Sequence, residues 1–211
     1  MDKQIQIDTF TRLIRVSRET IRSLVAYENF LTKSNESLNL IGNSTVNQIW
    51  NRHFLDSVQV IDFIDKNDKS LIDLGSGAGF PGLVLSIVSK ERKLPIKIKL
   101  IEKSQKKVKF LNDVIKMFDL NTKVINQNIL KDPIKFSDDV FVARAFKPLK
   151  IIFELIHNKA KNWKKIFIYL GKTGKYELLQ ASKSWDIEYK QRVSVTSNDS
   201  VIIEINKLKK K

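Results

Sequence analysis

The sequence predicts an α/β fold in which helices cover a seven-stranded, mostly parallel sheet that ends in an antiparallel hairpin. Three observations predict it. Between residues 71 and 170, short apolar segments typical of strands alternate with amphipathic helical segments. Four of the seven glycines lie within residues 75–82, directly after the first of these strands. Near the C-terminus, two segments alternate polar and apolar residues and have no helix between them.

The N-terminal part of the chain predicts a helical appendage to this sheet. Apolar residues recur at helical spacing over residues 9–33. A second helix is expected over residues 44–64, and its inward face is formed by Val46, Ile49, His53, Leu55 and Val58. A charged loop then separates the appendage, residues 1–66, from one compact domain, residues 67–211.

The compact domain is predicted to contain five parallel strands at residues 71–74, 96–102, 123–127, 139–145 and 165–170. Helices are expected after the first, second and fourth strands, at residues 81–90, 104–120 and 148–161. Right-handed crossovers through these helices make the strands parallel. The final pair, at residues 185–191 and 200–207, lacks a crossover and must therefore be antiparallel.

Composition excludes several classes of chemistry. The chain has no Cys and two His, which rules out disulfides, thiolate zinc sites and cysteine nucleophiles, and disfavours a metal site. No apolar run approaches the roughly 18 residues that span a membrane. We therefore expect a cytoplasmic protein without a metal ion or a membrane partner.

The positive charge is concentrated in two stretches. The net charge is +15, and residues 90–123 and 147–211 carry 11 basic against 4 acidic residues and 15 against 6. Such a field attracts a polyanion, above all a nucleic acid. A lysine-rich composition spread over solvated surfaces is the alternative explanation.

The glycine cluster predicts a nucleotide-cofactor loop. Gly75, Gly77 and Gly79 follow a strand that ends near Asp73, whose carboxylate we expect to face the crevice as one acceptor for the cofactor. Glu102 ends the next strand, where such folds bind ribose hydroxyls, and is expected to be the other acceptor. Residues 77–82 also fit the dinucleotide pattern G-x-G-x-x-G, but Pro81 falls inside it and lacks an N–H for a pyrophosphate. The spacing of Asp73 to the glycines favours S-adenosylmethionine.

Four blocks of the chain resemble the glucose-inhibited division protein B family, the ribosomal RNA small-subunit methyltransferases G. They are NLIGNSTVNQIWNRHFLDSV (39–58), LIDLGSGAGFPGLVLSI (71–87), IEKSQKKVKFLNDV (101–114) and VARAFKPL (142–149). The resemblance covers residues 10–206. It implies a class I, Rossmann-like methyltransferase that uses S-adenosylmethionine to methylate N7 of a 16S rRNA guanine near the decoding centre. Its partner would be 16S rRNA or a small-subunit particle, and we expect a monomer.

The resemblance also implies roles for particular residues. Gly75 and Phe80 match positions that line the S-adenosylmethionine pocket, and Glu102 matches the acid for the ribose. Ile129 and Leu130 match the pair around the adenine, although family members often carry an acid at the second position. Arg144 matches an arginine near the methyl donor and the incoming base.

Guanine N7 has a lone pair and no proton, so its methylation needs alignment rather than a general base. Arg144 is the candidate catalytic residue, orienting the guanine or the cofactor carboxylate; a surface ion pair is the alternative. The candidate RNA-binding residues are Arg52, His53, Phe146, Lys172 and Lys175. Packing roles for His53 and Phe146, and a merely solvated loop at 171–175, remain open.

Two other functions remain open from the residues alone. The G-x-G-x-x-G frame permits an NAD-dependent oxidoreductase, against which Pro81 and the terminal hairpin argue. The charge alone permits a non-catalytic RNA-binding module. That alternative gives no reason for Asp73, the glycine loop and Glu102 to occur together.

Overall fold

A seven-stranded mixed sheet forms the centre of the computed structural model, which describes residues 2–211. The strand order is β3–β2–β1–β4–β5–β7–β6. Strands β1 to β5 are parallel, and β7 runs antiparallel to β5 and β6, so the predicted fold is confirmed. The strands are β1 (Ser70–Leu74), β2 (Lys97–Glu102), β3 (Thr122–Asn126), β4 (Val140–Arg144), β5 (Lys165–Leu170), β6 (Trp185–Ser194) and β7 (Ser197–Lys210).

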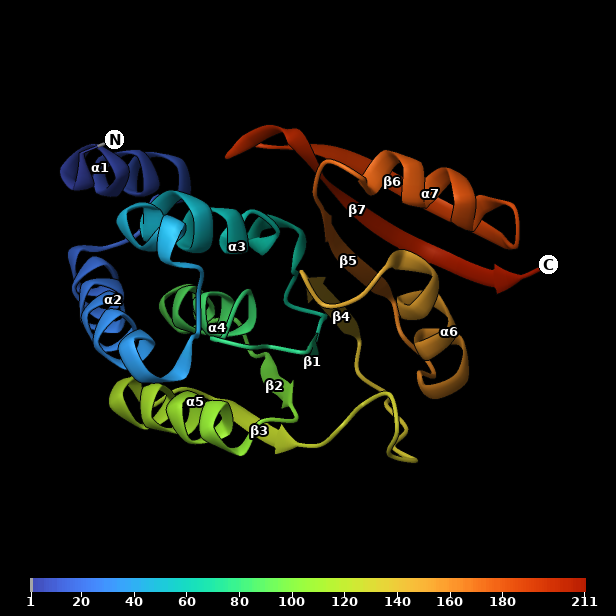
Figure 1. Cartoon of the computed structure of the whole chain (residues 1–211), viewed down its shortest axis with the longest axis horizontal. Coiled ribbons are helices and arrows are strands. Elements are labelled where there is room, and N and C mark those ends of the chain that lie inside the picture. The colour runs from blue at the N-terminus through green and yellow to red at the C-terminus, as the bar shows by residue number, and fades with distance from the viewer. Residues whose placement is uncertain (1) are drawn as a thin grey trace.

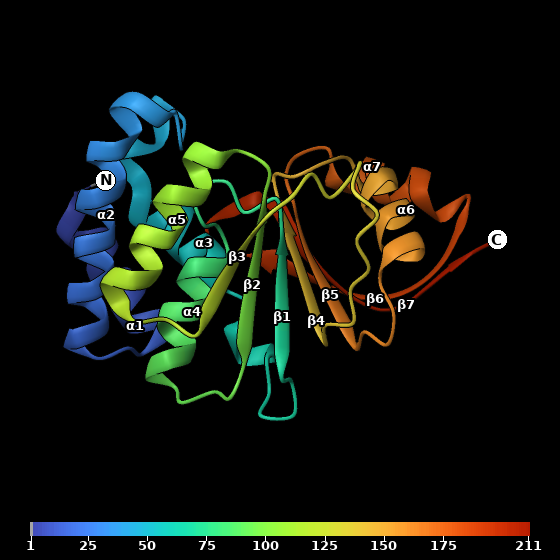
Figure 2. The same cartoon turned by 90° about the horizontal axis from the view of Figure 1, so that it is seen from below.

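Helices cover both faces of this sheet (Figure 1). Seen from below, α4 and α5 lie on one side together with the N-terminal helices, whereas α6 and α7 lie on the other (Figure 2). No helix within residues 2–211 combines the length and the apolar character needed to cross a membrane. The longer helices are α1 (Lys3–Ile14), α2 (Arg18–Leu38), α4 (Gly82–Glu91), α5 (Gln105–Phe118), α6 (Leu149–Lys159) and α7 (Gly174–Ser182).

The sheet separates two hydrophobic clusters. Successive side chains of a strand point to opposite faces, so Val140 and Val142 join one cluster while Phe141 joins the other. The first cluster also contains Phe10 and Leu24 from the N-terminal helices. The appendage therefore shares a core with the sheet, and the division of the chain at residue 66 stays a prediction.

The helix expected over residues 9–33 is two helices, so that prediction was wrong. Arg15 adopts a left-handed conformation with φ +55° and ends α1, its N–H donating to the Thr11 carbonyl. Ser17 then caps α2 by accepting a hydrogen bond from the Thr20 N–H. The apolar spacing continues across this break, and so the periodicity did not reveal it.

The helix expected over residues 44–64 is a series of short helices of different pitch. They are the 3₁₀-helix η1 (Asn43–Gln48), the π-helix η2 (Trp50–Leu55), α3 (Asp56–Val58) and the 3₁₀-helix η3 (Ile61–Phe63). Ile49, Leu55 and Val58 are buried as expected, whereas Val46 and His53 are half-buried. This segment supplies one wall of the site described below.

Helix α7 was not predicted. It begins at Gly174, within the stretch 171–175, which the sequence predicts to be a loop. Only Leu178 and Ala181 bury apolar side chains within it, so the sequence pattern is weak.

Candidate functional site

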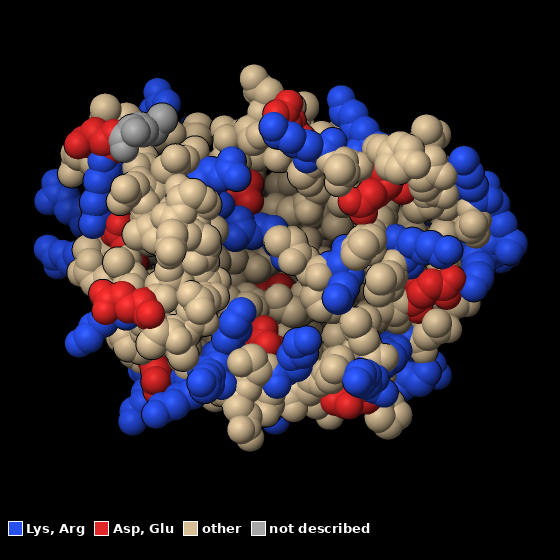
Figure 3. Space-filling model, in the orientation of Figure 1, with Lys and Arg blue, Asp and Glu red and all other residues tan. Residues whose placement is uncertain are grey.

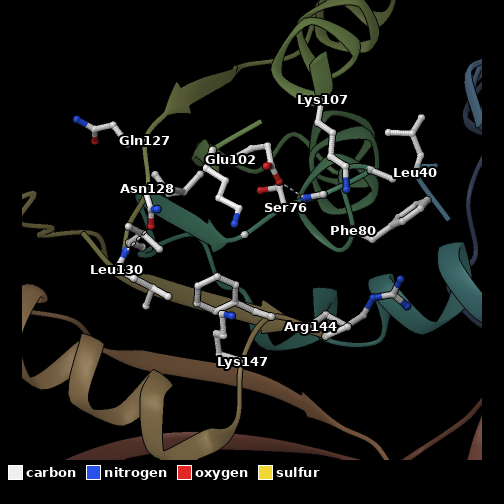
Figure 4. Close-up of a pocket in the computed structure, with 18 of the residues that line it drawn as sticks. Leu40, Ser76, Phe80, Glu102, Lys107, Gln127, Asn128, Leu130, Arg144 and Lys147 are labelled. Atoms are coloured by element: carbon white, nitrogen blue, oxygen red, sulfur yellow. Dashed lines mark hydrogen bonds between the residues drawn. The ribbon is translucent and has the colours of Figure 1, made fainter. Parts of the chain in front are cut away.

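A cavity of about 640 Å³ opens at the carboxyl ends of β1, β2 and β4. We call it the main cavity. It lies where the strand order reverses between β1 and β4, which is where open α/β sheets bind ligands. Figure 4 shows the side chains that point into it from several loops. Of the residues predicted to hold a cofactor, it is lined by Gly75, Gly77, Phe80, Glu102, Ile129, Leu130 and Arg144.

The loop after β1 presents its backbone to the cavity at Gly75, where it has no side chain. Gly75 has φ +75°, a conformation that favours glycine. A Cβ atom at Gly75 would lie 2.2 Å from Cδ2 of Phe146. The Phe146 ring therefore packs on the Gly75 backbone and forms part of the cavity wall.

Two residues of the predicted cofactor loop lie behind the cavity wall. Gly79 has φ +96°, and a Cβ there would lie 2.4 Å from Cδ1 of Leu83. Asp73 is fully buried, and its Oδ2 accepts a hydrogen bond of 3.0 Å from the Gly82 N–H. Burial raises the pKa of Asp73 to about 7. The expectation that Asp73 faces the crevice was wrong, because its carboxyl group lies beneath the loop.

Glu102 connects the loops that follow β1 and β2. Its Oε2 accepts a hydrogen bond of 3.0 Å from the Gly77 N–H, and its Oε1 accepts one of 2.8 Å from the Ser104 N–H. The bond to the glycine loop is the dashed line beside Glu102 in Figure 4. Each carboxylate oxygen keeps a second lone pair for a ligand in the cavity.

Several lining residues were not predicted. Lys107 extends from α5 toward the cavity (Figure 4). Asn128 lines the cavity just after the end of β3, in the same way that Glu102 lines it at the end of β2. The position of Asn128 after a parallel strand was the available signal, since all such ends meet at one edge of the sheet. Leu40 lines the opposite wall, and no sequence pattern pointed to it.

Arg144 is held by the run of short helices at residues 43–63, which we call the N-terminal segment. Its Nη1 donates to the Arg52 carbonyl at 2.9 Å and to Oδ2 of Asp56 at 2.7 Å. Its Nη2 lies 2.9 Å from Nδ1 of His53, and its guanidinium group stands 5.3 Å from the centre of the Phe80 ring. These contacts use three of its five N–H donors and leave two for a ligand.

The π-helix η2 explains why the Arg52 carbonyl is available. The Asp56 N–H donates to the carbonyls of Asn51 and His53 and passes over that of Arg52, which would be its partner in an α-helix. Such π-turns are rare and occur mainly at functional sites. The irregular helix thus presents both a carbonyl and a carboxylate to Arg144.

His53 is neutral in this arrangement. Burial, together with the positive charges of Arg144 and Arg52, lowers the pKa of His53 to about 3. Because Arg144 can only donate, Nδ1 of His53 accepts and Nε2 carries the proton. Nε2 then donates to Oγ1 of Thr45 at 2.8 Å, and that hydroxyl donates to the Gly42 carbonyl at 2.7 Å. This chain of hydrogen bonds links Arg144 to the wall at Gly42.

The candidate RNA-binding residues lie in different environments. Phe146 is half-buried in the cavity wall, and His53 belongs to the Arg144 network. Arg52, Lys172 and Lys175 are exposed. Figure 3 shows Lys and Arg side chains spread over one face of the molecule and around the hollow near its centre.

Comparisons with known proteins point to one family. The model described as "GidB: rRNA small subunit methyltransferase G" matches residues 20–205. The chain is 37% identical over 198 residues to the ribosomal RNA small subunit methyltransferase G of Pelagibacter ubique, covering 93% of this chain and 92% of that protein. It is 36% identical over 197 residues to the protein of that name from Rickettsia akari, covering 93% and 99%.

Solved structures share the fold at low sequence identity. TrmK of M. capricolum, in complex with S-adenosyl-homocysteine, gives a TM-score of 0.53 at 19% identity and covers 72% of this chain and 67% of its own. The ribosomal protein L11 methylase of Lactobacillus delbrueckii subsp. bulgaricus gives 0.53 at 15% identity, covering 78% and 79%.

Proposed function

Because the chain belongs to the family of rRNA small subunit methyltransferase G, we propose that it methylates N7 of one 16S rRNA guanine near the decoding centre. Membership makes it a methyltransferase that uses S-adenosylmethionine and acts on small-subunit rRNA. The N7 atom and the residues that carry the reaction are the proposed part. The observation that supports it best is the convergence of Gly75, Glu102 and Arg144 on one cavity.

The main cavity fits S-adenosylmethionine. Its volume of about 640 Å³ lies within the range of small-molecule sites. Glu102 offers carboxylate oxygens for ribose hydroxyls. Leu130 is 42% exposed although it is apolar, and it lines the cavity next to the buried Ile129. A flat adenine ring bound against these two residues would cover Leu130. Gly75 lines the same cavity and adds no side chain to it.

The start of α4 disfavours a dinucleotide. A pyrophosphate binds the free N–H groups at a helix N-terminus. Here the Gly82 N–H donates to Asp73, the Leu83 N–H donates to the Gly79 carbonyl, and Pro81 has no N–H. The oxidoreductase alternative therefore finds no free N–H group at positions 81, 82 and 83, where the helix begins.

The residues of the chain act by positioning. S-adenosylmethionine, when bound, would supply an electrophilic methyl group: the lone pair of guanine N7 would form the bond to the methyl carbon as the carbon–sulfur bond breaks and S-adenosylhomocysteine leaves. Glu102 and the glycine loop would fix the nucleoside end of the cofactor. Arg144 would orient the guanine or the cofactor carboxylate with its two remaining N–H donors, because its other three are fixed by the protein.

No proton transfer is needed, and the buried titratable groups agree with that. His53 stays neutral, and Asp73 lies beneath the loop. Lys172 and Lys175, which are exposed beside β5, would contact the rRNA backbone. The substrate is 16S rRNA or a small-subunit particle, and we propose that the protein meets it in the cytoplasm as a monomer.

Transfer of a labelled methyl group tests the function. The protein is incubated with labelled S-adenosylmethionine and either 16S rRNA or small-subunit particles. N7-methylguanine is then located by borohydride reduction and aniline cleavage of the chain. We expect cleavage at one guanine near the decoding centre. Label on another base atom would contradict the N7 assignment, and RNA binding without transfer would favour the non-catalytic alternative.

A further inference from the structure

A second cavity, of about 310 Å³, lies beside the main one at the carboxyl ends of β4 and β5. The start of β7 lies at the same edge because that strand is antiparallel to β5. The N-terminal segment closes the other side. Its lining includes Thr45, Arg52, Tyr169, Gly171, Thr196 and Ser200.

The two cavities share a wall. His53, Arg144 and Ala145 line both of them. Ala145 has φ +48°, a left-handed conformation that few residues other than glycine adopt, and such strain often occurs at functional sites. A methyl acceptor must reach the methyl donor, so its binding place has to adjoin the main cavity. The second cavity meets that requirement at Arg144 and Ala145.

The lining of the second cavity suits a purine with polar edges. Within residues 2–211, neither the Arg52 guanidinium nor the Ser200 hydroxyl has a hydrogen-bonding partner in the structure. Arg144 keeps two unused N–H donors at the shared wall. Arginine is the usual partner of guanine O6, which lies next to N7 on the same edge of the base. Hydroxyl groups can accept hydrogen bonds from the opposite edge.

A third cavity also touches the main one but fits a base less well. It shares Ala145, Phe146 and Lys147 with the main cavity. Its remaining lining is largely apolar, and its carboxylate, Glu177, already accepts hydrogen bonds from the Leu149 N–H and the Thr173 hydroxyl. It therefore offers few polar groups for the edge of a base.

We propose that the second cavity holds the target guanine, turned out of the rRNA stack, with Arg52 and Arg144 donating to its O6 atom and leaving the N7 lone pair free toward the main cavity. This assignment rests on the function proposed above. Enzymes that modify a stacked nucleic-acid base generally turn it out of the helix to reach the reacting atom. Lys172 is 85% exposed next to Gly171 and would contact a phosphate of the same strand.

Filling the cavity tests the assignment. A Cβ atom at Gly171 would meet no atom of residues 2–211 within 4 Å, so the first atom of the new side chain in Gly171→Leu has room. Gly171 borders the third cavity as well, whereas Ser200 borders only the second of these two. Ser200→Leu adds bulk from β7, and a strand tolerates the larger side chain. For both variants we expect unchanged S-adenosylhomocysteine binding in calorimetry. We expect kcat/KM for methyl transfer to small-subunit rRNA to fall about tenfold or more.

Gly42→Leu is the matched control. Gly42 lines the main cavity, and its Cβ would meet nothing closer than Oγ of Ser44 at 4.0 Å. This variant should weaken S-adenosylhomocysteine binding, which the two filling variants leave intact. Undiminished transfer by Gly171→Leu and Ser200→Leu, with the unsubstituted protein active, would overturn the base cavity alone. An inactive unsubstituted protein would overturn the proposed function and the base cavity together.

Discussion

Nη1 of Arg144 lies 2.7 Å from Oδ2 of Asp56, and this ion pair joins the end of β4 to the N-terminal segment. Both side chains are mostly buried, at 14% and 19% exposure. Asp56 is fixed in turn, because its Oδ1 accepts hydrogen bonds from Thr196 and Gln59 at 2.9 and 3.1 Å. The wall between the two cavities therefore depends on contacts among three distant parts of the chain.

Asp56→Ala should destabilise the protein and impair methyl transfer. The substitution leaves the Arg144 guanidinium without its counter-charge. Losing a hydrogen-bonded charge pair of this kind lowers the free energy of unfolding by about 2–3 kcal/mol. Urea unfolding measures the change. Asp62→Ala is the control, since Asp62 forms an exposed ion pair with Arg92 whose loss should cost less than about 1 kcal/mol. Equal losses for the two variants would contradict the importance of the Arg144 contact.

Gly75→Ala should destabilise the glycine loop for two reasons. Its φ of +75° strains any other residue, and its new Cβ would clash with the Phe146 ring. Phe146→Ala removes the ring, so the double variant Gly75→Ala/Phe146→Ala should recover the part due to the clash. Gly77→Ala is the comparison variant for the clash. Gly77 also has a positive φ, but its Cβ would meet nothing closer than the Gly75 carbonyl at 4.0 Å, so this variant should show backbone strain alone. Strictly additive effects of the Gly75 and Phe146 substitutions on unfolding would refute the clash.

The pH dependence of stability should contain two opposite contributions. The pKa of His53 falls to about 3 on folding from an ordinary value near 6.5. Between these values the unfolded chain binds a proton that the folded chain does not, so the free energy of unfolding decreases as pH falls from about 6.5 toward 3. The pKa of Asp73 rises to about 7 on folding from an ordinary value near 4. Between these values the folded chain keeps a proton that the unfolded chain has lost, so the free energy of unfolding decreases as pH rises from about 4 toward 7. The two oppose each other between about pH 4 and 6.5.

Substitution separates these contributions. Relative to the unsubstituted protein, His53→Gln should make the unfolding free energy fall more steeply with rising pH, by up to about 1.4 kcal/mol per pH unit. Asp73→Asn should shift the slope in the opposite direction. Urea unfolding at several pH values between 4.5 and 6.5 measures both slopes. Slopes that stay the same in both variants would show that neither group titrates as described.

Lys172→Glu/Lys175→Glu should weaken rRNA binding and leave cofactor binding unchanged. Both lysines are exposed, and neither lines the main cavity. Each lost phosphate contact should also reduce the slope of log affinity against log salt by about 1. Filter binding at several salt concentrations gives the slope. Lys109→Glu/Lys116→Glu, on α5, is a charge-matched control, and an equal loss in that variant would indicate only a general charge effect.

The sequence could predict the sheet because burial leaves a direct trace in it. The runs around Leu71 and Phe141 are apolar since both faces of a parallel sheet are covered. The break at Arg15 left no such trace, because neither Gly nor Pro marks it and the apolar spacing continues. Helix α7 buries too few apolar side chains to show a helical pattern.

The site was predictable where a residue's place follows from strand direction. Gly75, Glu102 and Arg144 end or follow parallel strands, whose carboxyl ends meet at one edge. The orientation of Asp73 was not predictable, because it depends on a bond to Gly82 in the next helix. The contact of Arg144 with Asp56 depends on tertiary packing and a π-helix, which no local pattern encodes.

Calorimetric titration with S-adenosylhomocysteine tests the assignment of the main cavity most directly. Saturable binding by the unsubstituted protein should weaken about 10- to 100-fold in Glu102→Ala, which loses a charged acceptor for the ribose and the bond to Gly77. Glu188→Ala, an exposed position on β6, should bind as the unsubstituted protein does. Absence of binding, or equal affinity in the Glu102 and Glu188 variants, would contradict a cofactor site at this cavity.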